Sequence, residues 1–379
     1  MTKFKDIIKN LDKPLFFLTL VLFVLGLVMI FSASNVTSYM NGGSPYAYFL
    51  RQGLFLIVSF IFCIFMVKFN TKFYGMISNL LLIAFVAVLI LLLIYGSATN
   101  YAISWIPIGP FTLQPSEFIK VIMIVFMARF YEVHEKRLNN FFIAIIPLII
   151  GVIITFLIML QPDLGTAIIF AALTGIIFFS SPVSKTIKLK VIALFVGMCL
   201  VVGAVLIMTG GSILQSRQLE RFNFTRPCDR LLDTGNQVCN GYIAINNGGL
   251  TGIGLGNSTQ KYLYLPYPYT DFIFAVIVEE LGLVTGIAII IAYLYLLYRI
   301  LKIGRESYTN RGALICYGVA VYIFLHIAIN LMGLFGLMPM TGVPLPFMSY
   351  GGSFTLCLMA SLALVQRVNI ENRLRDEKK

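Results

Sequence analysis

The chain has 379 residues, of which 59% are hydrophobic and only 12% are charged, and its formal net charge is +12. A mean hydropathy of +0.91 excludes an ordinary soluble globular domain and is typical of a polytopic membrane protein. The positive charge requires no nucleic-acid partner, because the cytoplasmic loops of membrane proteins are rich in basic residues.

Apolar runs of about 20 residues recur along the chain, the length that a ~30 Å hydrocarbon core requires. We predict an all-α fold with ten transmembrane helices in a single integral membrane domain, 1–379. The predicted spans are Leu15–Ser34, Phe49–Val67, Tyr74–Tyr95, Ser116–Val133, Phe141–Leu160, Leu164–Ser181, Val191–Thr209, Thr270–Leu301, Gly312–Leu337 and Ser349–Val368. The first span lacks a small-residue cleavage pattern, so we expect it to stay in the membrane.

The basic residues indicate the orientation of these spans. With a cytoplasmic N-terminus, 21 of the 28 Lys and Arg residues fall on the cytoplasmic side, which satisfies the positive-inside rule at every short loop. We therefore expect both termini in the cytoplasm. The segment 210–269, between spans seven and eight, is then one long extracytoplasmic loop.

Six charged residues lie in or against apolar spans, all toward the external side. They are Glu117, Lys120, Asp163, Asp271, Glu279 and Glu280. An ionised side chain at the bilayer centre costs roughly 3 kcal/mol, so such residues persist when they are paired, hydrated or used in function. We expect Glu279 and Glu280 about two turns deeper in the eighth span than Asp271. The convergence of the six predicts a functional site near one membrane face.

Structural roles are also open to some of these residues. Glu117 and Lys120 are three residues apart, so they share a helix face and can neutralise each other. Asp163 follows a Gln-Pro turn, where a carboxylate suits the N-cap of the sixth span.

The long loop carries arginines and glycines in unusual number. The arginines are Arg217, Arg221, Arg226 and Arg230. They can hold a phosphate group by bidentate hydrogen bonds, or form a solvated surface. The glycine cluster GGLTGIGLG, Gly248–Gly256, has no βαβ context and no Walker lysine, which excludes a nucleotide site. We expect its backbone to pack tightly against helices or to approach a bulky ligand.

The six cysteines fall into two groups by position. Cys228 and Cys239 lie in the external loop, where oxidising conditions permit the disulfide that we predict. The other four lie in apolar spans as small hydrophobic residues. The two histidines, His134 and His326, are far apart in sequence, which argues against a zinc site.

Five motifs together identify a family. They are QPSEFIK (Gln114–Lys120), LQPDLGTA (Leu160–Ala167), NNGGLTGIGLGNSTQKYLYLP (Asn246–Pro266), TDFIFAVIVEELG (Thr270–Gly282) and GLMPMTGVPLPFMSYGGSF (Gly336–Phe354). They resemble the SEDS family of bacterial cell-wall polymerases, the FtsW and RodA proteins, over essentially the whole chain, with FtsW slightly favoured. The resemblance implies a peptidoglycan glycosyltransferase of the cytoplasmic membrane that polymerises lipid II, an undecaprenyl-diphosphate-linked disaccharide, for cell division or elongation. It also implies a class B penicillin-binding protein and other division or elongation proteins as partners.

The resemblance also assigns residues. It implies Asp271 as the catalytic carboxylate and five central-cavity residues, which are Arg51, Trp105, Glu117, Lys120 and Asp163. We add five candidate substrate-binding or cavity residues, which are Arg217, Arg221, Glu279, Ser349 and Gly351. The chain departs from the family where Tyr267 replaces a glutamate, Tyr269 replaces a histidine and Ser104 replaces a basic residue.

The implied chemistry needs a base and a positive charge. A carboxylate within hydrogen-bond reach of the acceptor sugar hydroxyl can take its proton as the bond forms, and Asp271 is the candidate. Lys120, Arg51, Arg217 and Arg221 can neutralise the leaving diphosphate. A divalent cation, Mg or Mn, can do the same with Asp271 as its ligand. We expect no organic cofactor.

Two alternatives come from other classes of protein. A flippase or transporter of lipid-linked precursors would also carry charged residues in a membrane cavity. It would need access from both faces, whereas the charged residues here favour the outer one. The repeat of LQPS at Leu113–Ser116 as LQPD at Leu160–Asp163 is too short to indicate internal symmetry. A noncatalytic scaffold would leave Asp271 and Glu117 unexplained.

Overall fold

The computed structural model describes residues 4–377, apart from 41, 96–103, 109–110, 210–226, 230–234 and 263. Ten long helices overlap the ten predicted spans. They are α2 (Lys13–Met40), α3 (Ala47–Lys68), α4 (Thr71–Tyr95), α5 (Pro115–Val133), α6 (Phe141–Met159), α7 (Leu164–Ser180), α8 (Lys185–Thr209), α11 (Ile273–Arg305), α12 (Asn310–Leu334) and α13 (Gly352–Asp376).

Eight of these helices are long and apolar enough to cross a membrane. The other two are α5, which carries the charged residues Glu117, Lys120, Arg129 and Glu132, and α7, which has 17 residues. At 1.5 Å per residue α7 is about 26 Å long, close to the ~30 Å hydrocarbon core. α5 packs against α4, α7, α12 and α13, and Glu117 and Lys120 are buried among these neighbours, while Arg129 and Glu132 are partly exposed. The fold is an all-helical polytopic membrane bundle.

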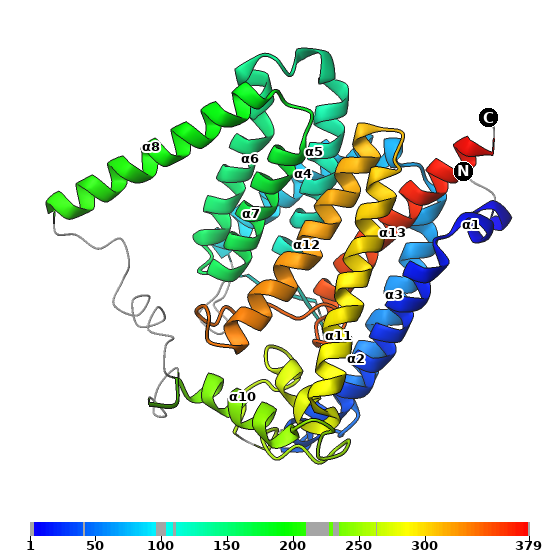
Figure 1. Cartoon of the computed structure of the whole chain (residues 1–379), viewed down its shortest axis with the longest axis vertical. Helices are drawn as coiled ribbons and strands as arrows, with labels where there is room; N and C mark the ends of the chain where they lie inside the picture. The colour runs from blue at the N-terminus through cyan, green and yellow to red at the C-terminus, as the bar shows by residue number, and fades with distance from the viewer. Residues whose placement is uncertain are drawn as a thin grey trace.

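The helices run side by side, and both ends of the chain lie at the same end of the bundle (Figure 1). The opposite end carries α10 (Gly235–Gly248) and the loop that follows it. We call this the distal end. α8 extends away from the other helices (Figure 1).

Several short elements were not predicted. Helix α1 (Phe4–Asn10) precedes the first span, and α10 lies in the loop that we expected to be irregular. Strands β1 (Ile106–Ile108) and β2 (Phe111–Leu113) pair antiparallel before α5, as a short hairpin attached to the helical bundle. Single 3-10 turns occur at Glu135–Arg137 and Pro227–Asp229.

α11 is two helical segments rather than one straight helix. Gly282 breaks it with φ 85° and ψ 165°. A Cβ on Gly286 would meet side-chain atoms of Val278 at 2.9 Å and Phe274 at 3.3 Å, although 12 residues of continuous helix span about 18 Å. The segment 273–281 therefore folds back on 283–305, which is the part long enough to span. The expectation that Glu279 and Glu280 lie deeper along one helix from Asp271 is wrong, because the chain reverses just after them.

The glycine-rich loop after α10 hydrogen-bonds the backbone on both sides of the break at Gly282. The backbone amides of Ile253 and Gly254 donate to the carbonyls of Glu279 and Glu280, each at 3.0 Å. The amides of Leu283 and Val284 donate in turn to the carbonyls of Gly249 and Leu250, at 3.0 and 3.2 Å. These bonds satisfy groups that the end of one helical segment and the start of the next leave free.

Glycine is required in this loop because the backbones approach closely. A Cβ on Gly252 would lie 2.3 Å from the carbonyl oxygen of Glu280, and Gly252 has φ +80°. A Cβ on Gly248 would lie 2.1 Å from the carbonyl oxygen of Val278. The sequence indicated tight backbone packing against helices, and this prediction is confirmed.

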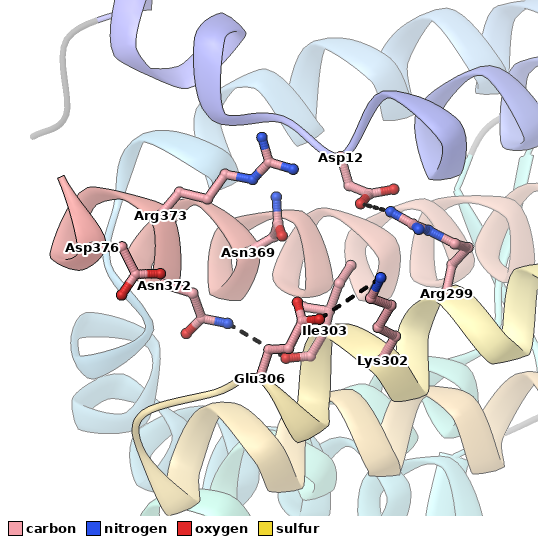
Figure 2. Close-up of a pocket in the computed structure, with 9 residues that line it drawn as sticks. All are labelled: Asp12, Arg299, Lys302, Ile303, Glu306, Asn369, Asn372, Arg373 and Asp376. Carbon is pink, nitrogen blue, oxygen red and sulfur yellow. Dashed lines mark hydrogen bonds and ion pairs between the residues drawn. The ribbon is translucent and has the colours of Figure 1, made fainter.

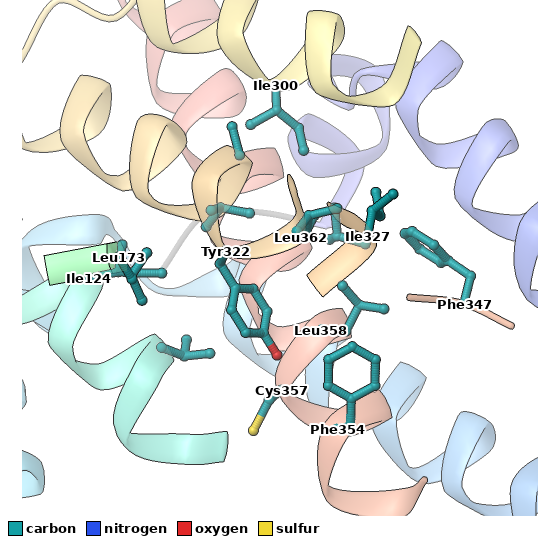
Figure 3. Packing of buried hydrophobic residues seen from close by; sticks show 14 of the residues in the cluster. Ile124, Leu173, Ile300, Tyr322, Ile327, Phe347, Phe354, Cys357, Leu358 and Leu362 are labelled. Atoms are coloured by element: carbon teal, nitrogen blue, oxygen red, sulfur yellow. The ribbon is translucent and has the colours of Figure 1, made fainter. Parts of the chain in front are cut away.

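The main hydrophobic core lies where α5, α7, α12 and α13 meet. Ile124, Leu173, Tyr322 and Leu358 come from these four helices and are buried together (Figure 3). This core surrounds the buried charges of α5.

We expect Gly252→Ala to lower the free energy of unfolding by about 2 kcal/mol or more, because it adds backbone strain at positive φ and a clash with Glu280. Gly256→Ala is the matched control. Gly256 has φ +84° but no atom within 4 Å of the added Cβ, so this variant pays only for the strain. Thermal unfolding of the detergent-solubilised proteins gives the comparison, and equal loss in the two variants would mean that the close approach is unimportant.

Candidate functional site

Glu117 and Lys120 form a fully buried ion pair on α5. The Lys120 Nζ donates to Glu117 Oε1 at 2.7 Å, and the two side chains are 0% and 3% exposed. The hydroxyl of Tyr322 donates to Glu117 Oε2 at 3.4 Å. Both residues lie in the first two turns of α5. Their spacing of three residues places them on the same face of the helix, as the sequence indicated.

His326 of α12 completes this group. Its Nε2 lies 3.0 Å from Lys120 Nζ. An ammonium group has only donors, so Nε2 accepts this bond, and Nδ1 is then the donor to the carbonyl of Pro344 at 3.4 Å. Sequence reasoning missed His326, because its spacing from Lys120 along the chain carries no signal of contact.

Asp163 lies at the N-terminus of α7 and has two partners. Its Oδ1 accepts from the amide of Thr166 at 3.0 Å, which is the N-cap bond that its position predicted. Its Oδ2 accepts from the side-chain amide of Gln114 at 3.0 Å. Gln114 also starts α5, so this bond joins the distal ends of two helices.

Asp271 lies in the turn just before the first segment of α11. Residues outside this turn donate hydrogen bonds to three of its successive backbone carbonyls. The Tyr350 amide donates to Tyr269 O at 2.9 Å, the Ser349 hydroxyl to Thr270 O at 2.6 Å, and the Asn330 side-chain amide to Asp271 O at 3.1 Å. The backbone that carries the carboxylate is therefore fixed at consecutive residues.

Asp271 is a partly exposed residue. Burial in this turn raises the pKa of Asp271 from its ordinary value of 3.8 to about 6. Because of this shift, the neutral acid persists up to a higher pH than in an ordinary aspartate. A group with this pKa is still mostly ionised at neutral pH and can accept a proton.

The loop 336–351 connects these groups. Thr341 and Val343 pack beside Gly165, next to Asp163, and Gly342 lies next to the carboxylate of Asp271. Asn330 donates to the carbonyl of Val343 at 2.9 Å while it holds Asp271. Asp163, Asp271 and the buried Glu117–Lys120–His326 group thus all border one loop.

Other predicted residues lie around this loop. The amide of Gly351 donates to Gln52 Oε1 on α3 at 3.2 Å, and Ser349 is buried and holds the Asp271 turn. Arg51 on α3 is exposed and lies close enough to Tyr350 for its charge to lower the pKa of that hydroxyl. Trp105 is 39% exposed and precedes β1, beside Ser104, whose hydroxyl lies 3.4 Å from the carbonyl of Gln161.

Glu279 and Glu280 belong to a different, saturated cluster. Glu279 accepts from the side chains of Asn247 and Ser258 and from both the amide and the hydroxyl of Thr259. Glu280 pairs with Lys261 at 2.8 Å. All their oxygens face protein, which ties the loop 256–261 to the fold. The substrate-binding role predicted for Glu279 therefore has no exposed atom to carry it in this structure.

The remaining predicted residues lie in the sequence between α8 and the end of α10. Arg217 and Arg221 lie outside the described residues, as do Arg226 and Arg230. Cys228 and Cys239 form a disulfide, which joins the 3-10 turn to α10.

A second polar pocket lies at the end of the bundle that carries the termini (Figure 2). Its volume is about 190 Å³, and it is bordered by three cations (Arg299, Lys302, Arg373) and three anions (Asp12, Glu306, Asp376). Asp12 is paired with Arg299, and Lys302 lies 3.9 Å from Glu306. Because the charges balance and pair internally, this pocket gives no preference for an anionic substrate, and we take the Asp271 region as the candidate site.

A family model described as cell cycle protein, for FtsW, RodA and SpoVE, matches residues 13–374 of the chain. The match covers nearly the whole length. The protein therefore belongs to the FtsW/RodA/SpoVE family.

Named relatives agree with this assignment. The probable peptidoglycan glycosyltransferase FtsW of Bacillus subtilis (strain 168) is 33% identical over 380 residues, covering 99% of this chain and 94% of that protein. Stage V sporulation protein E of the same strain is 35% identical over 358 residues, covering 92% and 94%.

Solved structures share the fold. RodA of Thermus thermophilus, a rod shape determining protein, aligns with a TM-score of 0.65 at 23% identity over 97% of this chain and 98% of RodA. A chain from a structure described as "Structural coordination of polymerization and crosslinking by a peptidoglycan synthase complex" aligns with a TM-score of 0.75 at 23% identity, over 95% of this chain and 97% of that one.

We expect Glu117→Ala and Lys120→Ala each to lower the free energy of unfolding by about 3–5 kcal/mol, because each leaves a buried charge without its partner. The double variant Glu117→Leu/Lys120→Met should lose less than either single variant, since no charge is left behind. The measurement is thermal unfolding in detergent.

An exposed pair provides the control. Lys302 and Glu306 are 45% and 58% exposed, so Glu306→Ala should change the free energy of unfolding by less than about 1 kcal/mol. Small losses in all three single variants would contradict a tightly coupled buried group.

Proposed function

We propose that Asp271 is the general base with which this protein polymerises lipid II into glycan strands. By family the protein is a peptidoglycan glycosyltransferase and a multi-pass protein of the bacterial cytoplasmic membrane. The observation that supports Asp271 is that the residue is partly exposed and lies on a turn whose three successive carbonyls accept hydrogen bonds from the loop 336–351 and α12.

The reaction joins the sugar hydroxyl of one lipid-linked disaccharide to the anomeric carbon of another. The hydroxyl oxygen forms the new bond, its proton passes to the Asp271 carboxylate, and the bond between the anomeric carbon and the lipid diphosphate breaks with inversion. A sugar hydroxyl is a very weak acid, so a positioned base contributes typically 10²- to 10⁴-fold to the rate. A carboxyl with a pKa of about 6 suits this role at neutral pH.

The leaving diphosphate requires positive charge near Asp271. Lys120 is fully buried against Glu117 and His326, which leaves Arg51 as the cation of the described residues best placed for the diphosphate. Arg217 and Arg221, which lie outside the described residues, remain candidates from the sequence.

A divalent cation is compatible with this arrangement. Mg²⁺ commonly takes one or two protein carboxylates and completes its ligands with substrate phosphates and water, and Asp271 supplies one carboxylate. Among the described residues no group of three or more His, Cys, Asp or Glu could hold a metal by itself. When bound, the ion would offset charge on the leaving diphosphate.

Topology and partner follow from the same proposal. With the basic termini in the cytoplasm, the distal end and Asp271 face the outside, where lipid II is polymerised. A class B penicillin-binding protein is the partner that crosslinks the strands. The likeness to a chain from a peptidoglycan synthase complex supports a partner of this kind.

The direct test is polymer formation by the Asp271→Asn variant. The purified protein, with and without a class B penicillin-binding protein, is incubated with labelled lipid II, and glycan strands are measured on gels. Asparagine keeps the size of the side chain and removes the proton acceptor, so we expect a 10²- to 10⁴-fold lower rate with intact folding and co-purification of the partner. Asp376→Asn, an exposed carboxylate at the other end, should retain full activity. Near-normal polymer from Asp271→Asn would remove Asp271 from the mechanism.

The raised pKa predicts a dependence on pH. Protonated Asp271 cannot accept the proton, so kcat/KM should fall about tenfold for each unit of pH below about 6 and level off above it. The residual activity of Asp271→Asn should lack this acid limb. A midpoint near pH 4 would mean that the carboxylate is solvated as in an ordinary aspartate.

A further inference from the structure

Three tyrosines lie against the turn that carries Asp271. The ring of Tyr48, at the start of α3, lies 4.5 Å from the ring of Tyr269 and 5.1 Å from that of Tyr350. The rings of Tyr269 and Tyr350 lie 6.0 Å apart. We call this group, Tyr48, Tyr269 and Tyr350, the tyrosine cluster.

The cluster is linked by hydrogen bonds as well as by ring contacts. The hydroxyl of Tyr269 donates to the hydroxyl of Tyr48 at 3.2 Å, and the backbone amide of Tyr350 donates to the carbonyl of Tyr269 at 2.9 Å. Tyr269 is 6% exposed, so its hydroxyl depends on a protein partner. Tyr269 lies two residues before Asp271 on the same turn, and its backbone carbonyl is one of the three that are held from outside the turn.

Arg51 lies near Tyr350, on the other side of the tyrosine cluster from Asp271. Burial raises the pKa of Tyr350, and the positive charge of the nearby Arg51 guanidinium opposes that rise. Arg51 is itself exposed. The tyrosine cluster thus lies between a solvent-facing cation on α3 and the turn with the carboxylate.

We propose that the tyrosine cluster is a positioning unit that fixes Asp271 relative to Arg51. This inference rests on the proposed function, in which the base and the leaving-group cation act on opposite sides of one anomeric carbon. Groups that act in one displacement must keep their separation to within a fraction of an ångström, and a misplacement of about 1 Å can cost roughly 10²-fold. Two tyrosines from loops and one from a helix, packed and hydrogen-bonded, supply that rigidity.

The test uses substitutions that keep the rings and remove single hydroxyl groups. Tyr269→Phe and Tyr48→Phe each delete the same hydrogen bond, so each should lower kcat about tenfold while KM for lipid II stays within about twofold. Because the bond is shared, the double variant should be no slower than the slower single variant. Tyr264→Phe is the control, since Tyr264 is 60% exposed, and it should match the wild type.

Two further variants separate positioning from folding. Tyr269→His, the residue that the family resemblance gives for this position, keeps a hydrogen-bonding group and should retain more kcat than Tyr269→Phe at equal thermal stability. Tyr350→Phe frees Arg51 and should raise KM more than it lowers kcat. Wild-type kcat in Tyr269→Phe, or losses that multiply in the double variant, would overturn the proposal.

Asp271→Asn in the same assay distinguishes the two hypotheses. If Asp271→Asn is inactive while Tyr269→Phe is normal, the positioning role is wrong and the proposed function stands. If Asp271→Asn is active, the proposed function fails first, and the cluster has no base to position.

Discussion

The pairing of the glycine-rich loop with the reversal in α11 is the constraint on which the distal end depends. A helix that stops inside a membrane protein leaves carbonyls and amides that lipid cannot satisfy. Here the carbonyls of Glu279 and Glu280 and the amides of Leu283 and Val284 are all bonded to the loop 249–254. The same two glutamates then hold residues 258–261 through their side chains. The backbone and side chains of Glu279 and Glu280 thus hold the glycine-rich loop in place. The loop in turn sets the position at which the chain returns to the bundle, toward Asp271.

Asp271 is held from the other side by a second loop. The loop 336–351 and α12 bond three successive carbonyls before α11, and Gly342, at φ +68°, packs against the carboxylate itself. Strands or a long helix would hold this residue as rigidly, but their side chains would cover it. Here two loops hold the backbone of Asp271 and still leave the residue partly exposed. A base that must contact a large lipid-linked substrate requires both properties.

The sequence was most informative about the features that the lipid bilayer determines. Hydrocarbon thickness sets helix length, so the spans could be predicted to within a few residues at most ends, and Glu117 with Lys120 could be paired from helical spacing alone. The reversal at Gly282 could not, because apolar residues predominate on both sides of this glycine and nothing local distinguishes a folded-back helix from a straight one. His326, Asn330 and the tyrosine cluster were missed for a related reason. Their contacts join residues dozens to hundreds of positions apart, and only the packed structure determines which of them meet.

Charge buried in a membrane protein is therefore an ambiguous signal of function. Lys120 and Lys261 are both fully buried and both paired with a glutamate, yet Lys261 closes a loop and Lys120 lies in the core beside the candidate site. A buried ion pair gains little net stability over apolar packing, so stability alone does not explain either pair. What distinguishes them is their surroundings. The oxygens of Glu279 and Glu280 are saturated by the loop 256–261 together with Ser32 and Asn247. Lys120 contacts His326, which bonds Pro344 of the loop that borders Asp271. The neighbours of a buried charge, more than the charge itself, indicate whether it belongs to a site.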